Sequence, residues 1–120
     1  LGKSRKAKTF ARATYKYLPV VLTAERAADV YRRLNDPDGA MRWYQRAVKK
    51  AKKTDEKATT HAGLAMLYRH MGKVEKALKE ARIAIYFTER VKHPKLLNPK
   101  LLIKILRSHI PELKKATLLR

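Results

Sequence analysis

The chain has 120 residues, and its 30 Lys and Arg against 10 Asp and Glu give a formal net charge of +20. Hydrophobic residues make up 45% of the sequence, enough for a folded core, which excludes a disordered basic tail. The lack of cysteine excludes disulfides, thiol nucleophiles and cysteine-based metal sites. The longest uncharged run, Ala58 to Tyr68, is far shorter than the about 18 residues of a membrane-spanning helix.

The positive charge is concentrated at the two ends of the sequence. Residues 1–24 carry six bases and no acid, and residues 91–120 carry eight bases and one acid. The positive charges within each end repel one another, so we expect an anionic partner to offset this repulsion. We predict a basic N-terminal extension over residues 1–22, a helical core over 23–92, and C-terminal capping helices with a basic face over 93–120.

Helix signals dominate the sequence, and no stretch alternates like a strand. Residues 1–8 read as a flexible basic leader, and residues 9–18 as a short helix that Pro19 ends. Thr23 is the expected cap of a helix that runs to residue 34. Asp36 can cap a third helix, in which Pro37 fits the first position and which extends to about Lys53.

Four more helices are predicted after Lys53. A fourth spans residues 54–71, and Gly72 suits the left-handed turn that follows it. A fifth covers residues 74–91, a sixth opens at Asn98-Pro99 and runs to residue 108, and a seventh runs from Pro111 to the end. The prediction is therefore an all-α chain of about seven helices.

The sequence matches itself at a shift of 37 residues, and each unit is helix, short turn, helix. Ala28, Tyr31 and Asn35 fall on Ala65, Tyr68 and Gly72. Small residues at matching positions allow two antiparallel helices to approach closely. We expect the following side chains to be buried between the helices: Ala28, Tyr31, Ala40, Tyr44, Ala47, Leu64, Tyr68, Ala77 and Ala84.

This pattern resembles the tetratricopeptide (TPR) repeat over about residues 23–90. The second unit shows it in Ala65, Tyr68, Gly72-Lys73, Ala77 and Ala84. The period is longer than the usual about 34 residues, and Trp is missing near the start of each unit. The resemblance implies a short α-solenoid of helical hairpins with basic N- and C-terminal extensions. It also implies protein partners, with Arg32, Arg33, Arg69 and His70 in the groove where members of the family bind them.

The third predicted helix carries a basic stripe, in which Arg42, Arg46, Lys49, Lys50 and Lys53 recur every three or four residues with no acid among them. Like charges at this spacing repel, so the stripe is unfavourable unless anions lie along it. It indicates a track for RNA phosphates, and an over-basic solvated surface is the alternative.

The N-terminal bases form a second predicted RNA-binding set: Lys3, Arg5, Lys6, Lys8, Arg12 and Lys16. Phe10, Tyr15 and Tyr17 are interleaved with them and could stack on unpaired bases. In the alternative, Phe10 and Tyr17 pack on the following helix. Trp43 is either a core anchor or a stacking platform.

No pattern in the sequence points to catalysis, a metal or a cofactor. The four histidines are not spaced as ligand pairs, and no nucleophile elbow or phosphate loop is present. We therefore expect a protein that is not an enzyme, has no small-molecule substrate and is not membrane-bound. The amphipathic basic helix near the C-terminus leaves an anionic membrane surface as a minor alternative.

These observations favour a non-catalytic structural component of a ribosome. Its basic faces would bind ribosomal RNA phosphates without sequence specificity, and its TPR-like helices would contact neighbouring proteins. The basic start and the first residue, Leu1 rather than Met, suggest the mitochondrial matrix, with the cytoplasm as the alternative. Two other functions stay open: an adaptor for an acidic peptide or protein, and a structural subunit of a mitochondrial membrane complex.

Overall fold

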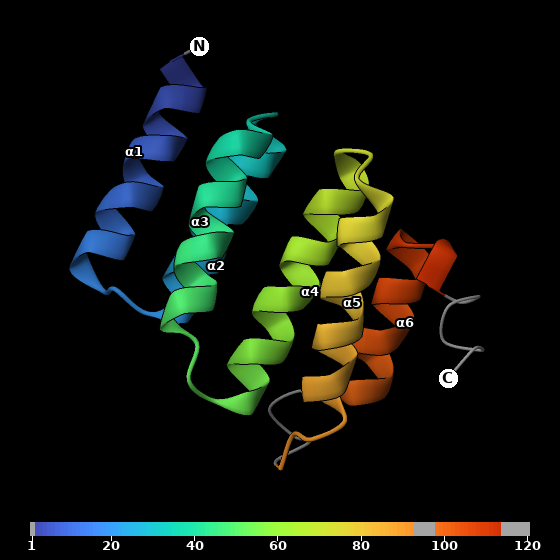
Figure 1. Cartoon of the computed structure of the whole chain (residues 1–120). Coiled ribbons are helices and arrows are strands. Elements are labelled where there is room, and N and C mark those ends of the chain that lie inside the picture. Colours follow the sequence, from blue (N-terminus) through green and yellow to red (C-terminus); the bar gives the residue numbers. More distant parts are fainter. Residues whose placement is uncertain (1, 93–97, 114–120) are drawn as a thin grey trace. The chain divides into compact units, whose positions relative to one another are not determined.

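The computed structural model describes residues 2–92 and 98–113, and within them every regular element is an α-helix. The chain divides into two compact units, residues 1–51 and 52–120, which are described separately below. Figure 1 shows the antiparallel helix pairs within each unit. The predicted all-α fold of TPR-like hairpins is thereby confirmed.

The first unit contains α1 (Gly2–Tyr17), α2 (Val21–Arg33) and α3 (Pro37–Lys50). Helix α2 packs against both α1 and α3. Small side chains line the contact between α2 and α3, and Ala24, Ala28, Ala40 and Ala47 are fully buried there. Because these side chains are short, the two helix backbones approach closely, and Tyr31, Trp43 and Tyr44 fill the space beside them.

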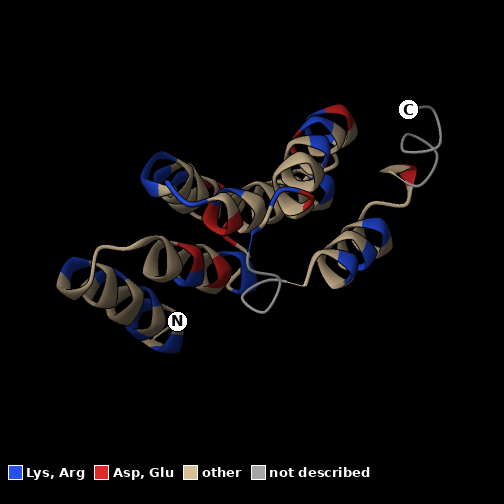
Figure 2. Ribbon diagram, turned by 90° about the horizontal axis from the view of Figure 1, so that it is seen from below, with Lys and Arg blue, Asp and Glu red and all other residues tan. Residues whose placement is uncertain are grey.

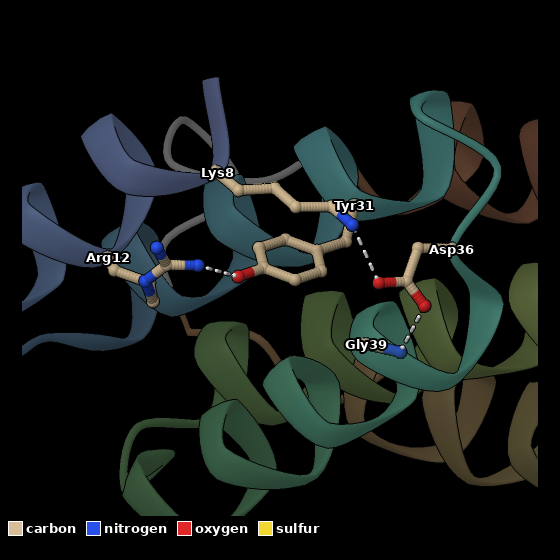
Figure 3. A network of polar contacts seen from close by, with 5 residues as sticks. All are labelled: Lys8, Arg12, Tyr31, Asp36 and Gly39. Atoms are coloured by element: carbon tan, nitrogen blue, oxygen red, sulfur yellow. Dashed lines mark hydrogen bonds and ion pairs between the residues drawn. The ribbon is translucent and has the colours of Figure 1, made fainter. Parts of the chain in front are cut away.

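The flexible leader predicted for residues 1–8 is wrong, since α1 is helical from Gly2. Two long-range contacts hold this helix to the hairpin that follows. The Lys8 ammonium pairs with the Asp36 carboxylate at 3.0 Å, and the Arg12 guanidinium donates to the Tyr31 hydroxyl at 2.9 Å (Figure 3). Neither contact is visible in the local sequence pattern, which therefore underestimated the length of the helix.

Helix α2 also begins earlier than predicted, and Thr23 is not its cap. The capping position is Val20, and Thr23 lies in the first turn. Its hydroxyl accepts from the Val20 amide and donates to the Leu18 carbonyl, so it satisfies the backbone of the α1–α2 turn instead. Asp36 caps α3 as expected, because its carboxylate accepts from the Gly39 amide at 3.0 Å and Pro37 follows in the first turn.

The second unit contains α4 (Thr54–His70), α5 (Val74–Thr88) and α6 (Pro99–His109). Helices α4 and α5 form the hairpin, and α6 packs against both. Leu106, Ile110 and Leu113 are fully buried against the small residues of α5, Ala77, Ala81 and Ala84. Asn98 caps α6 by accepting from the Leu101 amide. The end of α6 and the residues that follow it, up to Leu113, therefore complete the core of this unit.

The two hairpins repeat the same turn. Asn35 and Gly72, which lie 37 residues apart, both adopt positive φ, at 59° and 80°. In each turn the next amide bonds back to the aromatic residue of the first helix, from Asp36 to Tyr31 and from Lys73 to Tyr68, both at 2.9 Å. This is the hydrogen-bond pattern of a Schellman cap, so the internal repeat is present in the backbone.

Of the nine side chains predicted to be buried, eight are buried and Tyr68 is only half-buried. Tyr31 is covered by α1, whereas Tyr68 packs beside the core of the second unit, with the Lys76 ammonium 5.8 Å from its ring centroid. The two tyrosines thus occupy equivalent backbone positions but differ in what covers them.

Two predicted helix ends are wrong, and the seventh predicted helix lies mostly outside the residues that the structure describes. Helix α3 ends at Lys50 rather than near Lys53, because the amides of Lys52 and Lys53 donate to the Glu56 carboxylate at the start of α4. Helix α5 ends at Thr88 rather than at Val91. The seventh helix, predicted from Pro111, falls on residues of which only 111–113 are described.

Candidate anion-binding groove between helices α1 and α3

A groove of about 500 Å³ lies on the first unit and is lined by side chains of all three of its helices. We call it the α1–α3 groove. Four of its side chains are bases and three are aromatic, and none is acidic. The lining consists of Arg12, Tyr15, Lys16, Tyr31, Arg42, Trp43 and Arg46. The groove brings together members of two basic sets that the sequence predicted separately. Arg12 and Lys16 come from the N-terminal bases, and Arg42 and Arg46 come from the stripe on α3.

Arg12 is fixed in this groove by two hydrogen bonds. Its guanidinium donates to the Tyr31 hydroxyl at 2.9 Å (Figure 3). It also donates to the Thr9 hydroxyl at 3.2 Å. Both partners are neutral, so the positive charge of Arg12 is not cancelled. A guanidinium carries five donors, and the remaining ones are available to an anionic ligand.

Arg46 is positioned by aromatic rings. Its guanidinium carbon lies 4.5 Å from the Trp43 ring centroid and 5.4 Å from that of Tyr15. Tyr15 meets Trp43 edge to face at 5.1 Å, which links α1 to α3. Such cation–π contacts are worth roughly 0.5–1 kcal/mol at exposed sites and restrict the arginine without neutralising it. Trp43 is only 8% exposed, so it serves as a core anchor and not as a platform for bases.

Two acids of the first unit, Asp29 and Asp36, form ion pairs with bases that do not line this groove. Asp29 pairs with Arg32 and Arg33, and Asp36 pairs with Lys8. In the described part of the chain, no ion pair joins an acid to any of the four groove bases. Figure 2 shows α1 with Lys and Arg and no acidic residue along it. The groove is therefore an electropositive surface with a fixed geometry.

The Lys8–Asp36 pair has a structural role. The pKa of Asp36 is lowered, first by the hydrogen bond from the Gly39 amide and then by Lys8. The Lys8 ammonium also lies 5.0 Å from the centroid of the Tyr31 ring. Within the described residues, Lys8 differs from the other predicted RNA-binding bases in forming an ion pair with an acid of the chain.

The other predicted bases lie around the groove or away from it. Lys49 and Lys50 are exposed in the last turn of α3, and Lys3, Arg5 and Lys6 are exposed on α1. Lys53 does not belong to the α3 stripe, since it caps α4 in the second unit. The prediction that all five bases share one helix face is thus wrong at its last position.

Sequence reasoning missed the role of Tyr15 and Tyr31 in the groove. Tyr15 lies four residues after Ala11, the residue that α1 buries, and so faces the hairpin, but this burial is visible only in the structure. Phe10 and Tyr17 do not pack on α2, since their side chains are 73% and 91% exposed. That alternative is therefore wrong.

The predicted partner-binding residues of the repeats are mostly paired within the chain. Arg32 and Arg33 contact Asp29 at 2.6 and 2.9 Å, and Arg69 contacts Glu112 at 3.0 Å. His70 is exposed at the end of α4. No group of three His, Asp or Glu among residues 2–92 and 98–113 is placed to hold a metal ion. Within the same residues, no helix has the length and apolar character needed to cross a membrane.

Comparison with known proteins agrees with the hairpin architecture. Residues 23–58 match the tetratricopeptide repeat family, a segment that covers α2, α3 and the start of α4. Neither the curated proteins nor the solved structures gave a match to the chain. The chain thus contains a TPR-like segment, and a tetratricopeptide repeat indicates interaction with other proteins.

Proposed function

We propose that this protein is a non-catalytic, RNA-bound component of a ribosome, with the mitochondrial matrix as its compartment. The observation that carries the proposal is the α1–α3 groove, whose lining contains four bases and no acid, with none of the four in an ion pair among the described residues. Phosphate groups spaced along an RNA backbone are the ligand that best matches several bases in a row. The TPR-like hairpins would meanwhile contact neighbouring proteins of the assembly.

The two kinds of base in the groove suit different parts of this task. Arg12 and Arg46 are held by Tyr31, Tyr15 and Trp43, so each can present paired N–H donors to a phosphate with little loss of freedom. Lys16 and Arg42 are exposed and add positive charge at the rim. Because every contact is to a phosphate, binding depends on charge and carries little sequence preference.

The test is RNA binding by the full chain, measured as fluorescence anisotropy of a labelled oligonucleotide over a series of salt concentrations. Lys16→Glu combined with Arg42→Glu reverses the charge of two exposed rim bases that form no ion pair among the described residues. The matched control, Lys79→Glu with Arg82→Glu, makes the same charge change on the exposed side of α5. We expect the groove variant to bind far more weakly and with a salt slope smaller by about 2.

Equal weakening in both variants would mean that net charge, and not the groove, determines RNA binding. An adaptor for an acidic peptide makes a different prediction. A glutamate-rich peptide would then bind at physiological salt and displace the RNA from the groove. Co-sedimentation with ribosomal subunits at moderate salt, with the same two variants, tests the assembly itself.

A further inference from the structure

The outer side of α1 is apolar and exposed. Phe10 is 73% exposed and Tyr17 is 91% exposed, and Ala13 lies between them. We call these three residues the outer apolar face. Three further exposed hydrophobic side chains follow directly in the chain, Leu18, Val20 and Leu22. All the exposed large hydrophobic residues described in the first unit thus fall between residues 10 and 22.

This face is separate from the α1–α3 groove. Phe10 and Tyr17 are seven residues apart, about two helical turns, so they project from the same side of α1. Arg12 follows Phe10 by two residues and therefore lies about 160° away around the helix axis. A ligand on the outer apolar face would leave the groove accessible.

Helix α1 is covered on one side only. Ala11 is its single buried residue, whereas α3 buries five. A hollow of about 450 Å³ lies on its outer side, lined by Arg5, Lys6, Thr9, Phe10 and Ala13. Exposed hydrophobic patches bordered by polar residues are typical of interaction sites.

The basic residues beside the outer apolar face indicate that its partner carries acidic residues. Residues 1–24 contain no acid, so every charged side chain that α1 places around the outer apolar face is basic. Lys6 precedes Phe10 by four residues, and Lys3 precedes it by seven, which places both bases on the same side. A partner that buries Phe10 and Tyr17 must lie beside these bases, and acidic residues on its flanks would complement them.

The spacing and the type of side chain favour a helix over RNA. Phe10 and Tyr17 have rings, but the exposed Leu18, Val20 and Leu22 that follow them have none, so stacked RNA bases would leave these three side chains uncovered. A seven-residue repeat of large side chains is the spacing that packs against another helix. We propose that the outer apolar face binds an amphipathic helix of a protein partner that carries acidic residues beside its apolar stripe.

The test uses the full chain and a labelled synthetic peptide of three heptads, with Leu at positions a and d and Glu at e and g. The control peptide has Lys in place of each Glu. Phe10→Ser with Tyr17→Ser removes the face, and Tyr86→Ser with Leu101→Ser changes two side chains of the second unit that are also exposed. We expect the acidic peptide to bind the parent chain, and the first variant to bind it at least about tenfold more weakly.

RNA binding separates this proposal from the proposed function, since Phe10→Ser with Tyr17→Ser should leave RNA affinity unchanged. Equal affinity of the two peptides, or equal loss in both variants, would overturn the proposal. Loss of RNA affinity in the first variant without loss of peptide binding would assign the face to unpaired bases instead. Sedimentation velocity adds one more outcome: a dimer that disappears in this variant would make a second copy of the chain the occupant.

Discussion

The ring of Tyr31 occupies the space that a side chain on Gly39 would need. A Cβ atom built at Gly39 would collide with Cδ2 of Tyr31 and would lie 2.7 Å from the Asp36 carboxylate. The ring itself cannot retreat easily, because Lys8 and Arg12 contact it from α1 and Trp43 lies 6.3 Å away. This close approach joins the cap of α3 to the contact between α1 and α2.

Gly39→Ala should therefore destabilise the first unit. The methyl group forces Tyr31 or Asp36 to move, and overpacking of this kind costs roughly 1–3 kcal/mol. Urea unfolding followed by circular dichroism measures the change. Gly2→Ala is the control, since nothing lies within 4 Å of a Cβ at that position. Equal stability of Gly39→Ala and the parent chain would show that Tyr31 is free to move.

Ala77→Phe should destabilise the second unit in the same way. Ala77 is fully buried where α5 meets the core, among Ala81, Leu106 and Ile110. A benzyl group there separates the helices, at an expected cost of roughly 1–3 kcal/mol. Lys79→Phe introduces the same side chain on the exposed side of α5 and should cost much less. Thermal unfolding of both variants provides the comparison.

Trp43 should report directly on ligand binding, because it is the single tryptophan of the sequence and Arg46 lies over its ring. An anion that binds Arg46 changes the field at the indole, so RNA should shift the emission of the parent protein. Arg46→Ala should abolish this shift, and Arg46→Lys should retain a smaller one, since an ammonium lacks the planar contact with the ring. An unchanged shift in Arg46→Ala would place the ligand elsewhere.

Asp36 should make the fold sensitive to acid. Its pKa is lower in the folded chain than the value of about 3.9 expected when unfolded, so its contribution is complete above about pH 4. Stability is then lost as the pH falls through the lowered pKa. Asp36→Asn keeps an acceptor for the Gly39 amide but loses the pair with Lys8, so its stability deficit should shrink as acid is added.

Urea unfolding at a series of pH values between 7 and 2 tests this expectation. Asp38→Asn removes an exposed charge from the same turn of α3 and controls for the change in net charge. A deficit of Asp36→Asn that stays constant with pH would contradict the proposed pairing.

Ionisation of Tyr44 should destabilise the fold at alkaline pH. Burial raises its pKa to about 12, with the Asp29 carboxylate adding to the effect. The unfolded chain ionises near pH 10, so the stability contributed by neutral Tyr44 is complete below that pH and is lost between about pH 10 and 12. In an ultraviolet titration of the native protein, the last tyrosine signal should disappear in Tyr44→Phe.

Local signals in the sequence predicted most of the fold. Asp36-Pro37, Asn98-Pro99 and Gly72 marked helix ends correctly, because caps and left-handed turns depend on the residues within a few positions of them. The self-match of Tyr31 with Tyr68 located two equivalent turns in the same way.

The α1–α3 groove could be predicted only in part. Its bases were identified from their charge and spacing, but their meeting depends on contacts between distant residues, such as Arg12 with Tyr31 and Tyr15 with Trp43. Lys53 was misplaced for a related reason. The Glu56 carboxylate accepts hydrogen bonds from the amides of Lys52 and Lys53, which places these two residues at the start of α4. The sequence pattern of α3, which continues through Lys53, does not reveal these bonds.

The Lys8–Asp36 pair means that a salt titration of RNA binding records two events. Dissolved ions compete for the phosphates, and they also screen the half-exposed pair that helps to hold α1 beside the hairpin. Since α1 supplies Arg12 and Lys16, loosening this helix removes half of the groove's bases at once. The measured slope would then exceed the number of phosphates in contact, and circular dichroism at each salt concentration separates the two contributions.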